Sequence, residues 1–169
     1  SFILGSEGGI AVRILILTGK FGMGHLSAAN SLCQQLLRAC PQNRAEVVDL
    51  VAYAMPGACQ AVYKCFELLV TRGSGLFNLY YKMTENARMD LRPAFEPIFL
   101  DGLRRLLAQR RPDVVIATHP LCAQLVSRYK KEEGSGLPLI TCLTDISTHS
   151  EWTNGGTDCY PVGSGVLRR

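Results

Sequence analysis

Residues 12–25 read VRILILTGKFGMGH, and this stretch decides the fold. The apolar run from Val12 to Thr18 predicts a strand that is buried on both faces, as strands of parallel sheets are. The glycines at positions 19, 22 and 24 predict a tight turn that brings backbone N–H groups to the start of a helix. Apolar side chains at helical spacing then predict a helix over residues 25–40, which Pro41 ends.

The rest of the chain continues this alternation of strands and helices around a long insertion. Further strands are predicted at 46–50, 113–118 and 138–144, a short last strand at 159–162, and a helix at 120–133. Residues 56–111 instead contain no clear strand and three helical segments, at 56–71, 76–89 and 93–111. We therefore expect a Rossmann-like, mostly parallel α/β sheet with helices on both faces and a helical insertion.

Composition indicates one globular domain. The chain has 169 residues, of which 47% are hydrophobic and 19% charged, and its net charge of +4 permits an anionic partner without requiring one. We assign residues 1–11 to a flexible leader and 12–169 to the domain. Seven scattered cysteines without a CxxC pair argue against a disulfide framework or a zinc site and favour a reducing, cytosolic compartment. No apolar run reaches the length of about 18 residues that spans a bilayer.

His25 is the candidate base. It is predicted in the first turn of a helix, where the helix dipole favours a neutral imidazole, and a neutral imidazole can accept the proton of an alcohol. A histidine at a helix start can also be a surface or capping residue. The glycine turn is not a P-loop, since no Gly-Lys-Ser/Thr follows it. A dinucleotide fingerprint would need a glycine where Ser27 stands, although Asp49 would suit a ribose contact.

Residues 144–152, TDISTHSEW, begin at the carboxyl end of a predicted strand. The glycine loop lies on the same edge, so Asp145 could meet His25, fix its tautomer and stabilise its protonated form. Asp145 could equally cap a turn. Trp152, the only tryptophan, could enter lipid, contact an acceptor or simply pack within the fold. His119, at another strand end, could line the cleft or start the following helix.

Three stretches together resemble a known family. ILILTGKFGMGHLSAANSL, RPDVVIATHP and LTDISTHSEW occur in this order. They resemble the opening strand, glycine loop and helix, the strand-His-Pro segment and the Thr-Asp-rich loop of monogalactosyldiacylglycerol synthases and the related processive diacylglycerol glucosyltransferases of bacteria.

The resemblance implies the N-terminal, acceptor-binding half of an inverting GT-B glycosyltransferase that moves a hexose from a UDP-sugar to diacylglycerol, without a metal or a further cofactor. It implies His25 and Asp145 as catalytic residues, with either of them as the base. The acceptor contacts it implies are Gly22, Met23, Gly24, His119, His149 and Trp152.

The same resemblance implies a setting for the protein. We expect a cytoplasmic, peripheral position on the inner face of a membrane, anionic lipids as partners, and no nucleic acid. The nucleotide-sugar domain of the family is absent from this chain, so we expect the chain alone not to complete catalysis. Two alternatives stay open: the acceptor domain of a polyprenyl-lipid glycosyltransferase, and a non-catalytic membrane-docking module that recruits a donor-binding chain.

Overall fold

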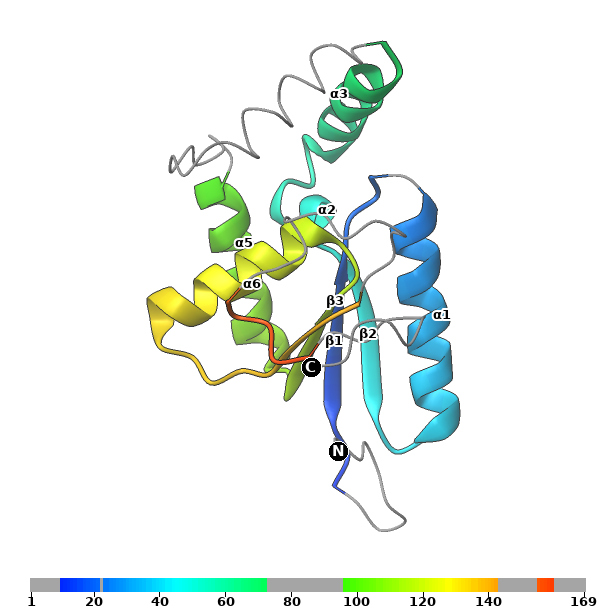
Figure 1. The fold of residues 1–169 in the computed structure, drawn as a ribbon, viewed down its shortest axis with the longest axis vertical. Coiled ribbons are helices and arrows are strands. Elements are labelled where there is room, and N and C mark those ends of the chain that lie inside the picture. Colours follow the sequence, from blue (N-terminus) through cyan, green and yellow to red (C-terminus); the bar gives the residue numbers. More distant parts are fainter. Residues whose placement is uncertain (1–9, 22, 73–95, 143–154, 160–169) are drawn as a thin grey trace.

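A four-stranded, all-parallel sheet forms the centre of the computed structural model, which describes residues 10–21, 23–72, 96–142 and 155–159 (Figure 1). The strand order is β2-β1-β3-β4. The strands are β1 (Arg13–Thr18), β2 (Arg44–Asp49), β3 (Val114–Ala117) and β4 (Leu139–Thr141). In register, Leu17 of β1 pairs with Val48 on one side and with Ala117 on the other. The predicted Rossmann-like α/β class is confirmed.

Helices cover both faces of this sheet. Helix α1 (Met23–Ala39) covers one face, and helices α2 (Leu50–Ala54), α5 (Glu96–Arg110) and α6 (Pro120–Glu133) lie on the other. The side chains of β1 point alternately to the two faces of the sheet, as in any strand. Ile14 and Ile16 belong to the core under α1, whereas Leu15 and Leu17 belong to the larger core under the other helices.

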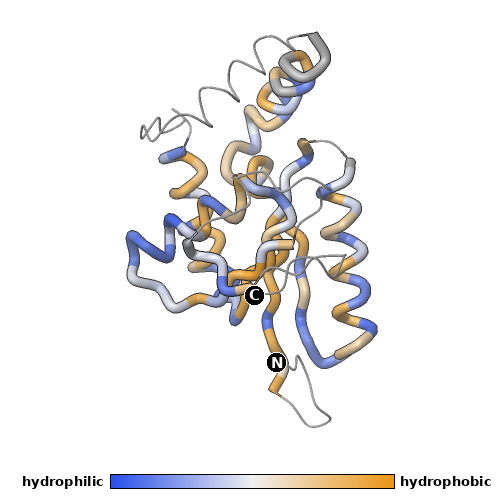
Figure 2. Tube along the Cα trace, viewed as in Figure 1, coloured by the Kyte–Doolittle hydropathy of each residue, from blue (hydrophilic) through white to orange (hydrophobic). Residues whose placement is uncertain are grey.

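Hydrophobic residues concentrate along the central strands, whereas the last turns of α6 are hydrophilic (Figure 2). The largest fully buried side chains are aliphatic and come from strands and covering helices alike; they include Leu15, Ile16, Leu17, Leu103, Leu106 and Leu139. Burying a side chain of this kind stabilises a fold by about 1.5–3 kcal/mol. The core therefore fixes the strand ends from which the candidate site is built.

Helix α3 (Cys59–Arg72) projects beyond the carboxyl edge of the sheet (Figure 1). Its first part attaches to the body, since Cys59 is buried and Val62 and Tyr63 pack against the core. Farther along, Leu68 is half exposed. Among the described residues, no helix is both long and apolar enough to cross a bilayer. The predicted insertion thus contributes α3 and α5, while its segment 76–89 lies outside the described residues.

Several predicted boundaries were wrong. Strand β2 runs over 44–49 rather than 46–50, because Leu50 begins the unpredicted helix α2. The Asp49 carboxylate accepts a hydrogen bond of 3.1 Å from the Ala52 N–H and caps this helix, which is the usual role of Asp before a first turn.

The other boundaries differ by a few residues. Strands β3 and β4 are shorter than the predicted 113–118 and 138–144, and α3 and α5 begin later than positions 56 and 93. Of the predicted last strand only Cys159 is described, in an isolated bridge to Ile140. The leader, residues 1–11, lies outside the described residues except for exposed positions 10 and 11.

Candidate active site

The candidate site lies where the chain reverses its direction across the sheet. From β1 the chain crosses to β2 on one side, and it later returns to β3 on the other side of β1. The carboxyl ends of β1 and β3 therefore form a topological switch point, the place where open α/β sheets bind ligands. The glycine loop follows β1, and Thr118 and His119 follow β3. The glycine loop and the segment after β3 thus share one edge, whereas the predicted place of residues 144–152 on this edge lies outside the described residues.

His25 is held against the end of β3 by two contacts with one residue. Its Nδ1 lies 2.9 Å from the carbonyl oxygen of Thr118, and the Thr118 hydroxyl donates to the carbonyl oxygen of His25 at 3.2 Å. A carbonyl oxygen can only accept, so Nδ1 carries a proton. In the neutral ring, Nε2 is then the nitrogen that can accept a proton. This is the tautomer that a general base acting through Nε2 needs.

His119 has the opposite tautomer. It is the N-cap of α6, and its Nδ1 accepts a hydrogen bond of 3.1 Å from the Leu121 N–H. In the neutral ring the proton is then on Nε2, which is a donor. Burial, as the larger cause, and the neighbouring His25 together lower the pKa of His119 to about 3. His119 is therefore neutral near pH 7. The sequence interpretation that His119 starts the following helix is confirmed, and its place in a ligand cleft stays a prediction.

Aromatic rings connect the two histidines with the glycine loop. The rings of His25 and His119 meet edge to face, with centroids 4.6 Å apart. Phe21 of the loop lies 5.0 Å from the His119 ring and 5.1 Å from the ring of Tyr63. Gly19 makes this packing possible, because a Cβ there would lie only 2.9 Å from the Phe21 ring. The loop thus needs its first glycine for close approach.

The other glycines and Met23 are less constrained. A Cβ at Gly24 would meet no atom within 4 Å, so no packing contact in the described structure requires glycine there. Met23 is placed as the first residue of α1, and Gly22 lies outside the described residues. His25, His119, Gly24 and the backbone of Met23 are thus the predicted site residues that the structure places at the switch point.

Asp145, His149 and Trp152 lie outside the described residues. Their predicted roles stay predictions, and so does the contact between Asp145 and His25. The partner that fixes the His25 tautomer within the described residues is the backbone of Thr118. Among the described residues, no group of three or more His, Cys, Asp or Glu side chains is placed to hold a metal ion.

Sequence reasoning missed three residues of this site. Thr118 acts through its backbone carbonyl, and Tyr63 comes from α3, far along the chain. Cys122, at the start of α6, donates to the carbonyl oxygen of Thr18 at 3.4 Å, and its burial raises the pKa of the thiol, so it serves packing rather than nucleophilic chemistry. Pro120 gave the one available signal, since a proline at the first helical position marks His119 as the N-cap.

Asp49, the residue that would contact a ribose in a dinucleotide-binding domain, forms hydrogen bonds within the protein. Its Oδ1 accepts hydrogen bonds from the Ala52 N–H and from the Tyr63 hydroxyl, at 3.1 and 2.5 Å. This carboxylate oxygen therefore holds α2 and α3 to the end of β2. The structure gives Asp49 an architectural role at the position that would suit a ribose contact.

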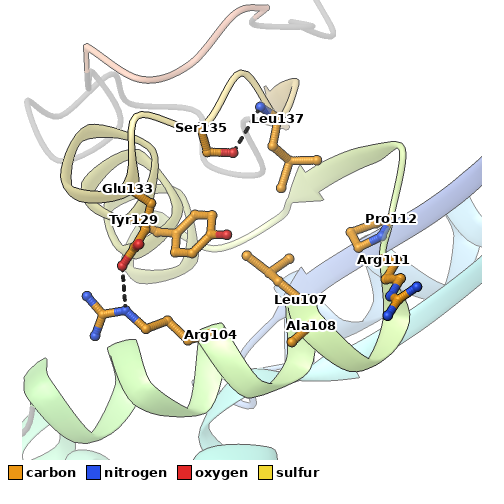
Figure 3. Close-up of a pocket in the computed structure, with 9 residues that line it drawn as sticks. All are labelled: Arg104, Leu107, Ala108, Arg111, Pro112, Tyr129, Glu133, Ser135 and Leu137. Atoms are coloured by element: carbon orange, nitrogen blue, oxygen red, sulfur yellow. Dashed lines mark hydrogen bonds and ion pairs between the residues drawn. The ribbon is translucent and has the colours of Figure 1, made fainter.

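A cavity of about 390 Å³ lies at the opposite edge of the sheet, between α5 and α6 (Figure 3). Arg111 and Pro112, which precede β3, and Ser135 and Leu137, which precede β4, line it. Arg104 pairs there with Glu133 at 2.9 Å. Because ligands of open α/β sheets bind at the carboxyl ends of the strands, this cavity at the amino ends is not the candidate site.

The chain is similar to proteins of one family over most of its length. Residues 25–167 match the family described as monogalactosyldiacylglycerol (MGDG) synthase. Proteins named processive diacylglycerol beta-glucosyltransferase, from Bacillus thuringiensis strain Al Hakam and Bacillus cereus strains AH187 and Q1, are each 28% identical to it over 158 residues. The aligned part covers 93% of this chain and 40% of each relative, so the chain spans less than half the length of these proteins.

Proposed function

Because this chain belongs to the monogalactosyldiacylglycerol synthase family, we propose that it supplies the acceptor-binding half of an inverting glycosyltransferase. The enzyme moves a hexose from a UDP-sugar to diacylglycerol at the cytoplasmic face of a membrane. The observation that carries the proposal is His25, whose Nδ1 lies 2.9 Å from the Thr118 carbonyl oxygen at the switch point of the sheet. This contact leaves Nε2 as the proton-accepting nitrogen of the neutral ring.

The chemical step uses this nitrogen. Nε2 of His25 removes the proton from the free hydroxyl of diacylglycerol, and the hydroxyl oxygen attacks the anomeric carbon of the donor. The bond from that carbon to the β-phosphate oxygen breaks, UDP leaves with the bonding electron pair, and attack from the opposite side inverts the anomeric centre. A positioned general base contributes about 10²–10⁴-fold to such a step.

His119 and Asp145 have supporting roles in this proposal. The neutral His119 presents Nε2–H as a donor beside His25, which suits an oxygen of the acceptor glycerol. Asp145 stabilises the imidazolium that forms when His25 takes the proton, as carboxylates beside catalytic histidines do. His149, Trp152 and the glycine-loop residues Gly22, Met23 and Gly24 contribute acceptor contacts, and the UDP group is bound by a further domain.

The position of α3 supports a membrane acceptor. This helix rises beyond the same edge of the sheet that holds His25, and it combines the exposed Lys64 with the half-exposed Leu68 (Figure 1). A projecting helix with cationic and apolar side chains can lie on an anionic lipid surface. Diacylglycerol would then reach the switch point from the membrane side.

A direct assay of the full-length protein tests this function. The protein is mixed with vesicles that contain diacylglycerol and with radiolabelled UDP-galactose or UDP-glucose, and lipid-soluble label is measured. We expect glycosyl-diacylglycerol as the product. Transfer to a polyprenyl-lipid acceptor but not to diacylglycerol would contradict the proposed acceptor, and absence of transfer to both acceptors would contradict the proposed reaction.

A further inference from the structure

One side chain from α3 holds the loop that leads to His25. The Tyr63 hydroxyl accepts a hydrogen bond of 3.1 Å from the backbone N–H of Lys20, in the glycine loop. The same hydroxyl donates to Oδ1 of Asp49 at the end of β2, at 2.5 Å. Tyr63 therefore ties together three segments that are separate in sequence: the loop after β1, the end of β2 and the projecting helix.

The Tyr63 ring adds a second contact with the same loop. Its ring meets that of Phe21 edge to face, at 5.1 Å and 74°. Phe21 in turn contacts His119, and His119 contacts His25. Aromatic rings at such separations attract one another beyond the burial of their surface. A row of four rings thus runs from α3 to the candidate base.

We infer that Tyr63 is a positioning residue of the active site, which sets the glycine loop and, through the Phe21 and His119 rings, the placement of His25. The inference rests on the proposed function for its effect on turnover. Because the Thr118 carbonyl oxygen also holds His25, loss of the Tyr63 hydroxyl disturbs the base without releasing it. The position of α3, which carries Tyr63, is thereby linked to the reaction.

The alternative is that the hydroxyl only attaches α3 to the body. The helix has other attachments, since Cys59 is buried and Val62 packs against the core. Tyr63→Phe keeps the ring and these contacts and removes only the hydroxyl. Burial and the hydrogen bond to Asp49 raise the pKa of Tyr63, so the wild-type hydroxyl is protonated throughout the pH range of an assay.

Tyr53→Phe is the matched control. The Tyr53 hydroxyl donates to Oε1 of Gln109 at 2.8 Å, between α2 and α5 and away from the glycine loop. Both substitutions remove one phenolic oxygen. A structural effect alone would therefore appear in both variants, as a lower thermal unfolding midpoint.

The test compares the two variants in the full-length protein. Turnover of diacylglycerol and UDP-sugar is measured together with the rate at which diethylpyrocarbonate modifies His25, followed by peptide mass spectrometry. For Tyr63→Phe we expect kcat to fall by about 5–30-fold, the effect of one or two lost interactions. We also expect a changed His25 modification rate and an unchanged KM for the UDP-sugar. For Tyr53→Phe, kcat and the modification rate stay at the wild-type values.

Two results would overturn the inference. One is wild-type kcat in Tyr63→Phe, and the other is a fall in kcat while His25 reacts at the wild-type rate. If the wild-type protein does not glycosylate diacylglycerol, the proposed function fails, and the His25 modification rate alone decides the role of Tyr63. If Tyr63→Phe does not fold, Phe21→Leu breaks the next contact in the row, and an unchanged His25 modification rate there would overturn the inference.

Discussion

The rings of His25 and His119 meet edge to face, yet different backbone partners give the two histidines opposite tautomers. A carbonyl oxygen faces Nδ1 of His25, and an N–H faces Nδ1 of His119. The neutral pair therefore offers one accepting nitrogen and one donating N–H. The sequence predicted His25 in the first turn of a helix and His119 directly after a strand. It could not assign these tautomers, because tautomers depend on partners that only the fold brings together.

The neutral state of His119 predicts a pH dependence of stability. Its pKa is about 3 in the fold against an ordinary 6.5, so the unfolded chain binds more protons between these values. The stabilisation is complete above pH 6.5 and is lost as pH falls towards 3. His119→Asn keeps a good N-cap residue but cannot titrate. We expect the wild type to lose about 1–2 kcal/mol of unfolding free energy relative to this variant between pH 7 and pH 5.

Urea unfolding of both proteins across this pH range measures the difference. The carboxylates titrate in both proteins and cancel in the comparison. Parallel curves for wild type and His119→Asn would show that His119 is not held neutral by burial.

At the scale of elements, the sequence located the long and strongly patterned segments and missed the short ones. Strand β1 and helix α6 match their predicted ranges, 12–18 and 120–133, within a residue. An apolar run marks the strand, and Pro120 at the start and Gly134 after the end mark the helix. Helix α2 was missed, since its five residues show no helical period. The contact of Tyr63 with the glycine loop could not be predicted from the sequence for a related reason. It depends on the direction that the chain takes after the unpredicted helix α2.

The packing of α2 on α5 predicts a cost for an added methyl group. A Cβ at Gly102 would lie 2.5 Å from the Ala54 Cβ and 3.0 Å from its Cα. Alanine is the better helix former by about 1 kcal/mol, but overpacking of a tight core costs about 1–3 kcal/mol. We expect Gly102→Ala to lower the unfolding free energy by up to about 2 kcal/mol, measured by urea unfolding.

Two further variants control this experiment. At Gly57 a Cβ would meet no atom within 4 Å, so Gly57→Ala should stay within about 0.5 kcal/mol of the wild type. Ala54→Gly removes the opposing methyl group, so Gly102→Ala should cost less in that background. Additive effects of the two substitutions would contradict the proposed close contact.

At the scale of the whole molecule, one edge of the sheet gathers the features that the proposed function needs. The switch point, the two histidines and the start of α3 all lie at this carboxyl edge (Figure 1). The amino edge holds the cavity that Arg111 and Pro112 line (Figure 3). This arrangement predicts that the protein faces a membrane with the carboxyl edge of the sheet, from which α3 projects. Charge on that edge should then matter more than charge elsewhere.

Vesicle flotation tests this orientation. The protein should float with anionic vesicles at low salt and detach at high salt, because each Lys or Arg near the surface contributes about 1 kcal/mol. Lys64 and Lys131 are both exposed, but only Lys64 lies on α3, whereas Lys131 lies near the end of α6. We expect Lys64→Glu to weaken flotation at least about fivefold and Lys131→Glu to leave it unchanged. Equal losses in both variants would argue against docking through α3.

The most direct test of the account is the turnover number of His25→Ala in the full-length enzyme. If Nε2 of His25 is the base, kcat should fall by about 10²–10⁴-fold, with a thermal unfolding midpoint close to that of the wild type. Asp145→Asn should cost less, and the double variant should lose little more than His25→Ala, because residues that act as a unit do not add. A near-wild-type kcat in His25→Ala, or a larger loss in Asp145→Asn, would contradict the assignment of His25 as the base.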